Sequence, residues 1–153
     1  MKKAIITAAT AIVVTAILAI GSIAGCAKKE EPAKQYTEAY LRTEETVITT
    51  TVDLTGGYSC EFATGAAYLY AKPDEDCEAI AISLDQEVYE DYLSAAQASA
   101  DSKEIKDGVM YQADGQMIYI CKVGDNGYFG IFAENADATK MESIVNRFAV
   151  ETF

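Results

Sequence analysis

The feature that constrains this chain most is a run of 24 uncharged residues near its N-terminus, from Ala4 to Ala27. The run is rich in Ala, Ile and Val, and the basic residues Lys2 and Lys3 stand directly before it. A short basic segment followed by an apolar stretch is typical of a secretory signal and is set apart from fold reasoning. The sequence therefore predicts that the rest of the chain is exported and folds outside the cytoplasm.

The apolar run ends in a specific pattern, Ile23-Ala24-Gly25-Cys26. Small side chains before the cysteine let the chain enter a signal peptidase, and the cysteine thiol can take a diacylglyceryl group. The pattern resembles the lipobox of bacterial lipoprotein signal peptides. The resemblance implies that residues 1–25 are removed and that lipid on Cys26 anchors the protein in the cell envelope. The expected place is the outer face of the cytoplasmic membrane, or the periplasmic side of an outer membrane in a two-membrane host.

Two alternatives stay open for this segment. One is an uncleaved transmembrane helix, because 24 uncharged residues are long enough to cross a bilayer. The other is an ordinary secretory signal that is cut before Cys26. Each alternative puts the remaining chain on the same side of the membrane as the lipoprotein hypothesis does.

Residues 26–46 are predicted to be the lipidated cysteine and a flexible tether. Lys28–Gln35 is polar, carries charges of both signs and contains a proline, a composition typical of a flexible spacer. Residues 36–46 either continue this tether or form a short helix with two tyrosines and a leucine on one side.

Residues 47–153 are predicted to form a single small domain of high negative charge. They contain 6 basic and 19 acidic residues, a net charge of −13. This charge excludes a nucleic-acid-binding protein that works by neutralising phosphates. Anionic lipid head groups also repel such a domain, so we expect the lipid on Cys26, and not the domain surface, to hold the protein at the membrane.

The domain contains short segments with β-branched or alternating apolar residues, separated by turns that contain glycine. Two of these turns, Asp114-Gly115 and Asp125-Asn126-Gly127, have the chemistry of tight hairpins. Such close spacing favours antiparallel pairing, because parallel neighbours need a long crossover connection. The predicted strand segments are Val47–Leu54, Tyr58–Phe62, Ala66–Ala71, Glu78–Leu84, Gly108–Ala113, Met117–Val123 and Tyr128–Ala133.

Two segments have the spacing of amphipathic helices. Asp85 is the predicted N-cap of a helix that runs to about Ala100, and Asp137 is the predicted N-cap of a second helix. In the second helix, apolar residues at helical spacing are Met141, Ile144, Val145, Phe148 and Ala149.

The predicted order of elements is strands, helix, strands, helix. We therefore expect an α+β fold, with an antiparallel sheet of about six short strands and two amphipathic helices that cover it. This order weakly resembles small envelope domains of the PsbP-like type. The resemblance concerns topology alone, and no motif accompanies it.

Three cysteines remain beside Cys26. An exported domain permits disulfides, and a Cys60–Cys77 bond is the pairing we predict. Cys121, in the middle of a predicted strand, is interpreted as a buried free thiol. Three free thiols are the alternative. The spacings contain no Cys-x-x-Cys, so neither a zinc site nor a redox pair is expected.

The chain contains no histidine, which excludes Ser-His-Asp and Cys-His catalysis. The acidic run from Asp74 to Glu78 lacks the spacing of a calcium-binding loop, so we predict no metal and no cofactor. A pair of carboxylates that hydrolyses a glycosidic bond stays open, because 19 acidic residues in the domain allow many pairs.

Tyrosine suits recognition surfaces, and five tyrosines fall on neighbouring predicted strands. They are the predicted ligand face: Tyr68, Tyr70, Tyr111, Tyr119 and Tyr128. Ordinary half-buried tyrosines of a sheet are the alternative. The first functional hypothesis is a non-enzymatic, membrane-anchored binding or accessory domain for a protein or peptide ligand. The others are a small carboxylate-dependent envelope hydrolase and a structural subunit of an envelope complex.

Overall fold

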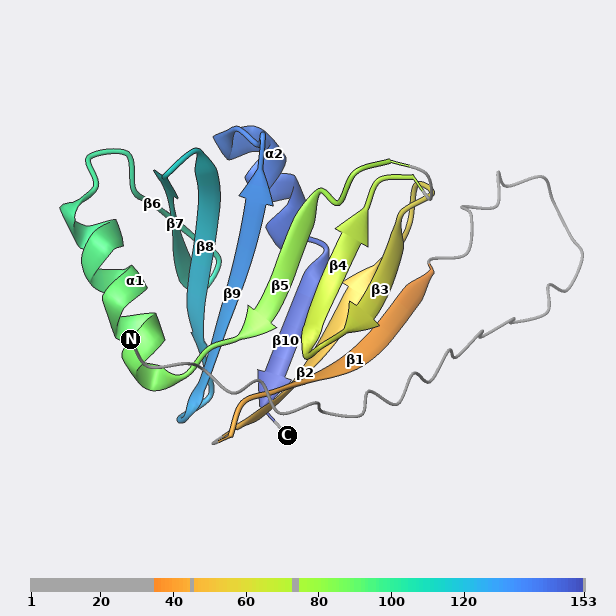
Figure 1. The fold of residues 1–153 in the computed structure, drawn as a ribbon, viewed down its shortest axis with the longest axis horizontal. Coiled ribbons are helices and arrows are strands. Elements are labelled where there is room, and N and C mark those ends of the chain that lie inside the picture. Colours follow the sequence, from red (N-terminus) through yellow and green to blue (C-terminus); the bar gives the residue numbers. More distant parts are fainter. Residues whose placement is uncertain (1–34, 45, 73–74, 153) are drawn as a thin grey trace, which may run out of the picture.

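The computed structural model describes residues 35–44, 46–72 and 75–152 (Figure 1). The predicted signal peptide, Cys26 and the tether up to residue 34 lie outside the described residues, and so does part of the acidic run. Within the described ranges, no helix is long and apolar enough to span a membrane.

The described chain forms two antiparallel sheets and two helices. The small sheet has the order β1-β2-β10, and the large sheet has the order β3-β4-β5-β9-β8-β7-β6. The helices are α1 (Gln86–Ala98) and α2 (Ala138–Val145). The strands are β1 (Tyr36–Arg42), β2 (Val47–Asp53), β3 (Ser59–Ala63), β4 (Ala66–Tyr70), β5 (Ala79–Ser83), β6 (Lys103–Ile105), β7 (Gly108–Ala113), β8 (Gln116–Val123), β9 (Gly127–Glu134) and β10 (Phe148–Thr152).

Antiparallel strands with two helices agree with the predicted α+β class in its coarse form. The prediction of one sheet of about six strands was wrong, because the described residues form sheets of three and seven strands. The predicted order was also wrong at its end, since a strand, β10, follows the second helix. The prediction omitted β1, β6 and β10. The strand β6 has only three residues, β1 buries a threonine and exposes two tyrosines, and the first residues of β10 continue the helical spacing of α2, so none of them shows a clear alternation of apolar and polar residues.

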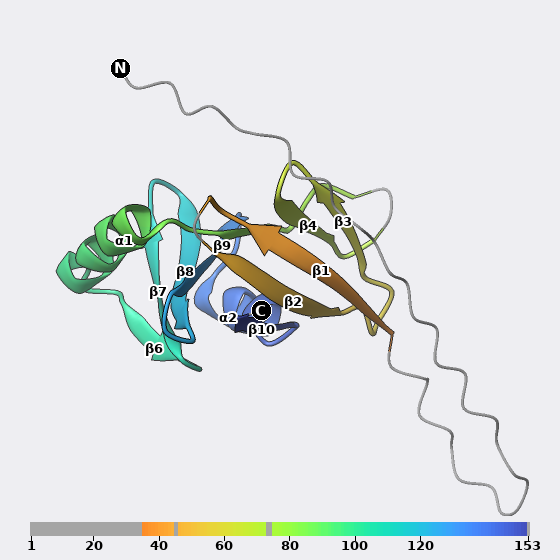
Figure 2. The same ribbon diagram turned by 90° about the horizontal axis from the view of Figure 1, so that it is seen from below.

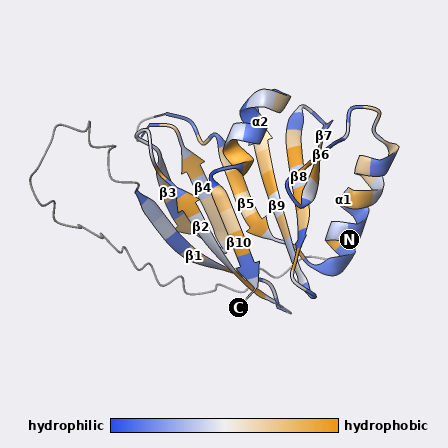
Figure 3. Ribbon diagram, turned by 180° about the vertical axis from the view of Figure 1, so that it is seen from behind, coloured by the Kyte–Doolittle hydropathy of each residue, from blue (hydrophilic) through white to orange (hydrophobic). Residues whose placement is uncertain are grey.

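The two faces of the large sheet are covered by different elements, and one face is covered only in part. The small sheet and α2 pack on one face, where the larger apolar core includes Leu69, Ile131, Met141 and Phe148. On the other face α1 packs over a smaller cluster around Ile118 and Ile120. Figure 2 shows α1 and α2 on opposite sides of the large sheet. Apolar residues run along the strands between them (Figure 3).

Residues 36–42 form the strand β1. The expectation that this segment continues the tether or forms a short helix was wrong. The strand pairs with β2 along its whole length, from Tyr36 opposite Asp53 to Arg42 opposite Val47. Its buried side chains alternate, and Leu41 keeps only 1% of its surface exposed. The buried positions include Thr37 and the exposed ones include Tyr36 and Tyr40, so the hydropathy of the sequence does not show this alternation. The folded domain therefore begins at β1.

The second helix begins as predicted and ends earlier than predicted. A carboxylate oxygen of Asp137 accepts a hydrogen bond from the backbone N–H of Lys140 at 2.7 Å, which confirms the N-cap. The helix ends at Val145, and Phe148 lies in β10 opposite Val52. Phe148 is apolar at a position that suits both a continued helix and a strand, and the free edge of β2 provides the partner that selects the strand.

Arg147 holds the turn between α2 and β10 in place. Its guanidinium donates hydrogen bonds to the backbone oxygens of Asp53 and Thr55, both at 2.9 Å. The same guanidinium lies 3.4 Å from the ring centroid of Tyr58. A cation stacked on an aromatic ring with two backbone acceptors is a well-ordered arrangement, and it joins the C-terminal turn to the end of β2.

Candidate functional site

The five tyrosines of the predicted ligand face do not form one surface. Tyr111 and Tyr119 are 1% and 3% exposed, and Tyr119 belongs to the larger core on the side of α2. Tyr128 is half-buried beneath α1, where its ring lies 4.7 Å from that of Tyr89. Tyr68 and Tyr70 are half-buried on the same side of β4. The structure therefore brings together only two of the five, on the side of the sheet that carries α1.

On this side α1 covers the strands β7, β8 and β9, and the sheet continues beyond it to β5, β4 and β3 (Figure 1). The strand register puts Tyr68 opposite Ile80, and Ile80 opposite Phe132. Ile82 lies two residues further along β5 on the same side. Ile80 is 37% exposed, and Tyr68, Ile82 and Phe132 are half-buried. We call these four residues the open strip.

The helix forms one border of the open strip. The ring of Tyr92 on α1 packs against that of Phe132, with their centroids 5.3 Å apart. At the other border, Glu61 on the edge strand β3 is exposed opposite Tyr68. The open strip is therefore an apolar surface that passes from under a helix to a charged sheet edge.

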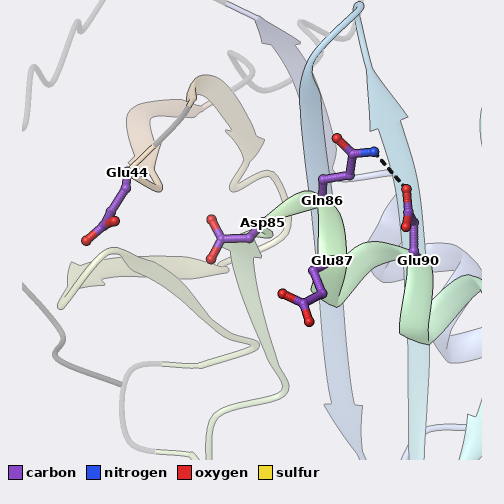
Figure 4. A pocket seen from close by; sticks show the side chains of 5 residues that line it. All are labelled: Glu44, Asp85, Gln86, Glu87 and Glu90. Atoms are coloured by element: carbon purple, nitrogen blue, oxygen red, sulfur yellow. Dashed lines mark hydrogen bonds between the residues drawn. The ribbon is translucent and has the colours of Figure 1, made fainter. Parts of the chain in front are cut away.

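A hollow of about 410 Å³ lies between the turn that joins β1 to β2 and the first turns of α1 (Figure 4). Its carboxylates belong to Glu44, Asp85, Glu87 and Glu90, and we call it the acidic pocket. In Figure 4, Asp85 points toward the side of Glu44, whereas Glu90 accepts a hydrogen bond from Gln86 at 2.7 Å. The three ion pairs formed by described residues involve other carboxylates, so no described cation neutralises this pocket.

The acidic pocket was not predicted from the sequence. The acidic residues of α1 form an ordinary exposed helix face by their spacing, and no local signal joins them to Glu44 some forty residues earlier. All four carboxylates are exposed, and the described residues contain no group that could hold a metal ion.

The described carboxylates include one partly desolvated group, Glu78, whose buried Oε2 has no hydrogen-bond partner among the described residues and whose Oε1 forms an ion pair with Lys140 at 3.1 Å. The Glu78 side chain keeps 15% of its surface exposed. A hydrolase of the predicted type uses two converging carboxyl groups, at least one of which is partly desolvated. In the described part of the chain no Asp or Glu residue is buried as a whole.

A second hollow, of about 510 Å³, lies between β8, β10 and the end of α2. Cys121 on its floor is 2% exposed, which agrees with the interpretation of a buried free thiol. Burial raises the pKa of this thiol, and burial also raises the pKa of the neighbouring Tyr119 hydroxyl. The ammonium of Lys106 donates to the backbone oxygens of Val145 and Phe148, at 3.2 and 3.0 Å. These groups are already occupied in packing and in closing the end of α2, so we assign no ligand to this hollow.

Cys60 and Cys77 are both free thiols in this structure. Cys60 on β3 lies opposite Leu69, and Leu69 lies opposite Ala79, so β4 separates Cys60 from the segment that contains Cys77. Burial, with smaller contributions from Cys77 and Glu61, raises the pKa of Cys60 to about 12. The Cys60–Cys77 bond stays a prediction for the oxidised protein.

Known proteins give no independent indication of what these surfaces do. No protein-family model, no curated protein and no solved structure matches the chain. The resemblance to PsbP-like domains gains no support from these comparisons. The open strip and the acidic pocket are therefore interpreted from their own geometry.

Proposed function

We propose that this chain is a lipid-anchored extracytoplasmic protein whose folded domain binds a protein or peptide partner and does not catalyse a reaction. The observation that carries the proposal is the open strip. Ile80 is 37% exposed on the part of the large sheet that α1 does not cover, and it lies between Tyr68 and Phe132. Contiguous exposed apolar and aromatic side chains are typical of surfaces that a partner covers.

The proposed anchor is consistent with the place where the fold begins. The lipobox-like pattern ends at Cys26, and β1 begins at Tyr36. Ten residues of extended chain span at most about 35 Å, so the tether is shorter than the sequence analysis predicted. The domain would remain close to the membrane, with little freedom to move away from it.

The hydrolase and the structural subunit, the two other functional hypotheses, are supported to different degrees by the structure. The hydrolase has one partly desolvated carboxylate in its favour, Glu78, but that group forms an ion pair with Lys140. A structural subunit of an envelope complex would use the same open strip, and would differ from a binding protein only in the permanence of its contact.

Cys26→Ala tests the anchor. We expect the variant to lose incorporation of labelled lipid and to accumulate as the uncleaved precursor. If the variant is the same size as the wild-type protein and equally membrane-bound, the segment is a transmembrane anchor.

Photo-crosslinking tests the binding face. A photoreactive phenylalanine derivative in place of Tyr68 is expected to give a discrete crosslinked product in intact cells. The same substitution at Tyr36, which is 46% exposed on the small sheet, is the matched control. Equal products at both positions, or none at either, would show that the open strip is not the binding face.

A further inference from the structure

The open strip and the acidic pocket are joined by the same strand. Ile80 and Ile82 belong to β5, and Asp85 follows two residues after β5 ends. A strand rises about 3.3 Å per residue, so Ile80 and Asp85 are separated by about 16 Å along the chain. One short segment of a partner, about five or six residues long when extended, can therefore contact both.

An exposed apolar side chain follows one of the pocket's residues in the chain. Val88, which follows Glu87 on α1, is 41% exposed. With Ile80 it is one of four large hydrophobic residues of the described chain that are this exposed, the other two being Tyr36 and Tyr40 on β1. Val88 does not line the pocket, so the apolar surface offered to a partner is the open strip, and a purely polar ligand would leave that strip uncovered.

Most of the basic residues between positions 36 and 153 make contacts away from the pocket. Five of them contact carboxylates or backbone oxygens away from the pocket: Lys72, Lys103, Lys106, Lys140 and Arg147. Residues 36–153, which include β1 and Glu44, contain 7 basic and 22 acidic residues, a net charge of −15, and the pocket brings four of these carboxylates together. The negative field of these charges attracts cationic partners and repels anionic ones, most strongly where the carboxylates lie together.

We infer that the partner is a peptide segment, free or part of a protein, that carries both Lys or Arg and apolar side chains. Its apolar side chains lie on the open strip, and its cationic side chains enter the acidic pocket. This inference rests on the proposed function and adds the chemistry of the partner to it.

The test uses the intact lipidated chain in nanodiscs of phosphatidylcholine, a lipid without net charge, with empty nanodiscs as the blank. The probe is a fluorescent peptide of about ten residues that combines Lys with Val and Tyr. One comparison peptide has Glu in place of every Lys, and another has Ser in place of every Val and Tyr. Fluorescence anisotropy gives the three dissociation constants. We expect only the peptide with both Lys and apolar residues to bind, and its affinity to fall as salt is added.

Paired variants locate the binding. Glu44→Lys with Glu87→Lys is expected to weaken binding about tenfold, which corresponds to about 1.4 kcal/mol. The control, Asp101→Lys with Glu38→Lys, makes the same change of charge at exposed carboxylates outside the pocket. It is expected to weaken binding less than about threefold, because screening limits the effect of distant exposed charges. Ile80→Ser is expected to weaken binding about fivefold, since it removes exposed apolar area, and Tyr36→Ser is expected to leave it unchanged.

Four results would overturn the inference. They are equal losses in the two charge-reversal pairs, equal binding by the Ser-containing peptide, equal binding by the Glu-containing peptide, and no binding by any peptide. If no peptide binds but the photoreactive residue at position 68 still captures a partner in cells, the partner is not cationic and the proposed function stands. If both experiments fail, the proposed function is wrong as well.

Discussion

Leu41→Ala decides whether β1 belongs to the folded domain or to a tether. Leu41 is 1% exposed and packs in the larger core, in a strand that is paired with β2 along its whole length. The substitution removes about three methyl or methylene groups, each worth about 0.8 kcal/mol, and leaves a cavity that adds to the loss. We therefore expect the free energy of unfolding to fall by about 3 kcal/mol.

The measurement is urea unfolding of the intact chain in mild detergent, followed by circular dichroism and by tyrosine fluorescence, since the chain has no tryptophan. With a slope of about 2 kcal/mol per molar urea, the midpoint should fall by about 1.5 M. Glu38→Ala, at an exposed position of the same strand, is the control and should change the free energy by less than about 0.5 kcal/mol. If the two variants unfold at the same urea concentration, residues 36–42 are not part of the cooperative fold.

Three further predictions concern stability. Gly108→Ala should lower the free energy of unfolding by about 3 kcal/mol, because a Cβ there would collide with the backbone oxygen of Ile120, and an unchanged urea midpoint would contradict this. Asp137→Ala should cost about 1 kcal/mol through the lost hydrogen bond from the Lys140 N–H, whereas Asp137→Asn should retain most of it. The raised pKa of Cys60, about 12 against 9.0 for an ordinary thiol, keeps its thiol protonated in the folded state after the unfolded chain has lost the proton. The contribution of this residue to stability is therefore complete below pH 9 and falls by about 1.4 kcal/mol per pH unit as the pH rises from 9 toward 12. Urea titrations at pH 8 and at pH 10.5 measure this loss. The free energy of unfolding should fall less between these two pH values for Cys60→Ala than for the wild type.

The sequence predicted those elements whose signal is local. The helix α1 lies within the predicted range that begins after Asp85, and the Asp137 cap begins α2 as predicted. The hairpin at Asp114-Gly115 has positive φ angles of 50° and 79°, as its residue types indicate. In each of these cases a few neighbouring residues supply the backbone preference.

The errors arose where a distant partner decided the outcome. Phe148 fits a helix by its spacing from Met141 and Ile144, but the edge of β2 turns it into a strand residue. The segment that begins at Tyr36 has no strong local preference, and pairing with β2 makes it a strand. In both cases β2 acts as the template, so its two neighbours lay outside what local patterns can predict.

In the candidate site, too, some features follow from local sequence patterns and others from contacts between distant elements. Tyr68 and Ile80 carry period-2 patterns that put them on one side of their strands, and the sequence shows this. The position of α1 on the sheet decides which strands stay open. The helix covers β7, β8 and β9 and leaves β5 and β4 uncovered. The approach of Glu44 to the first turns of α1 depends on how the two sheets pack.

The sequence by itself determined the charge of the domain, the exclusion of histidine chemistry, and most of the strands and helices, and it predicts export and a lipid on Cys26. These properties depend on composition and on patterns that a few consecutive residues contain. Only the tertiary structure decided that there are two sheets, which tyrosines are buried, and that an acidic pocket meets an apolar strip. The physical reason is that burial and proximity depend on which elements pack together, and residues far apart in the chain contribute to each contact.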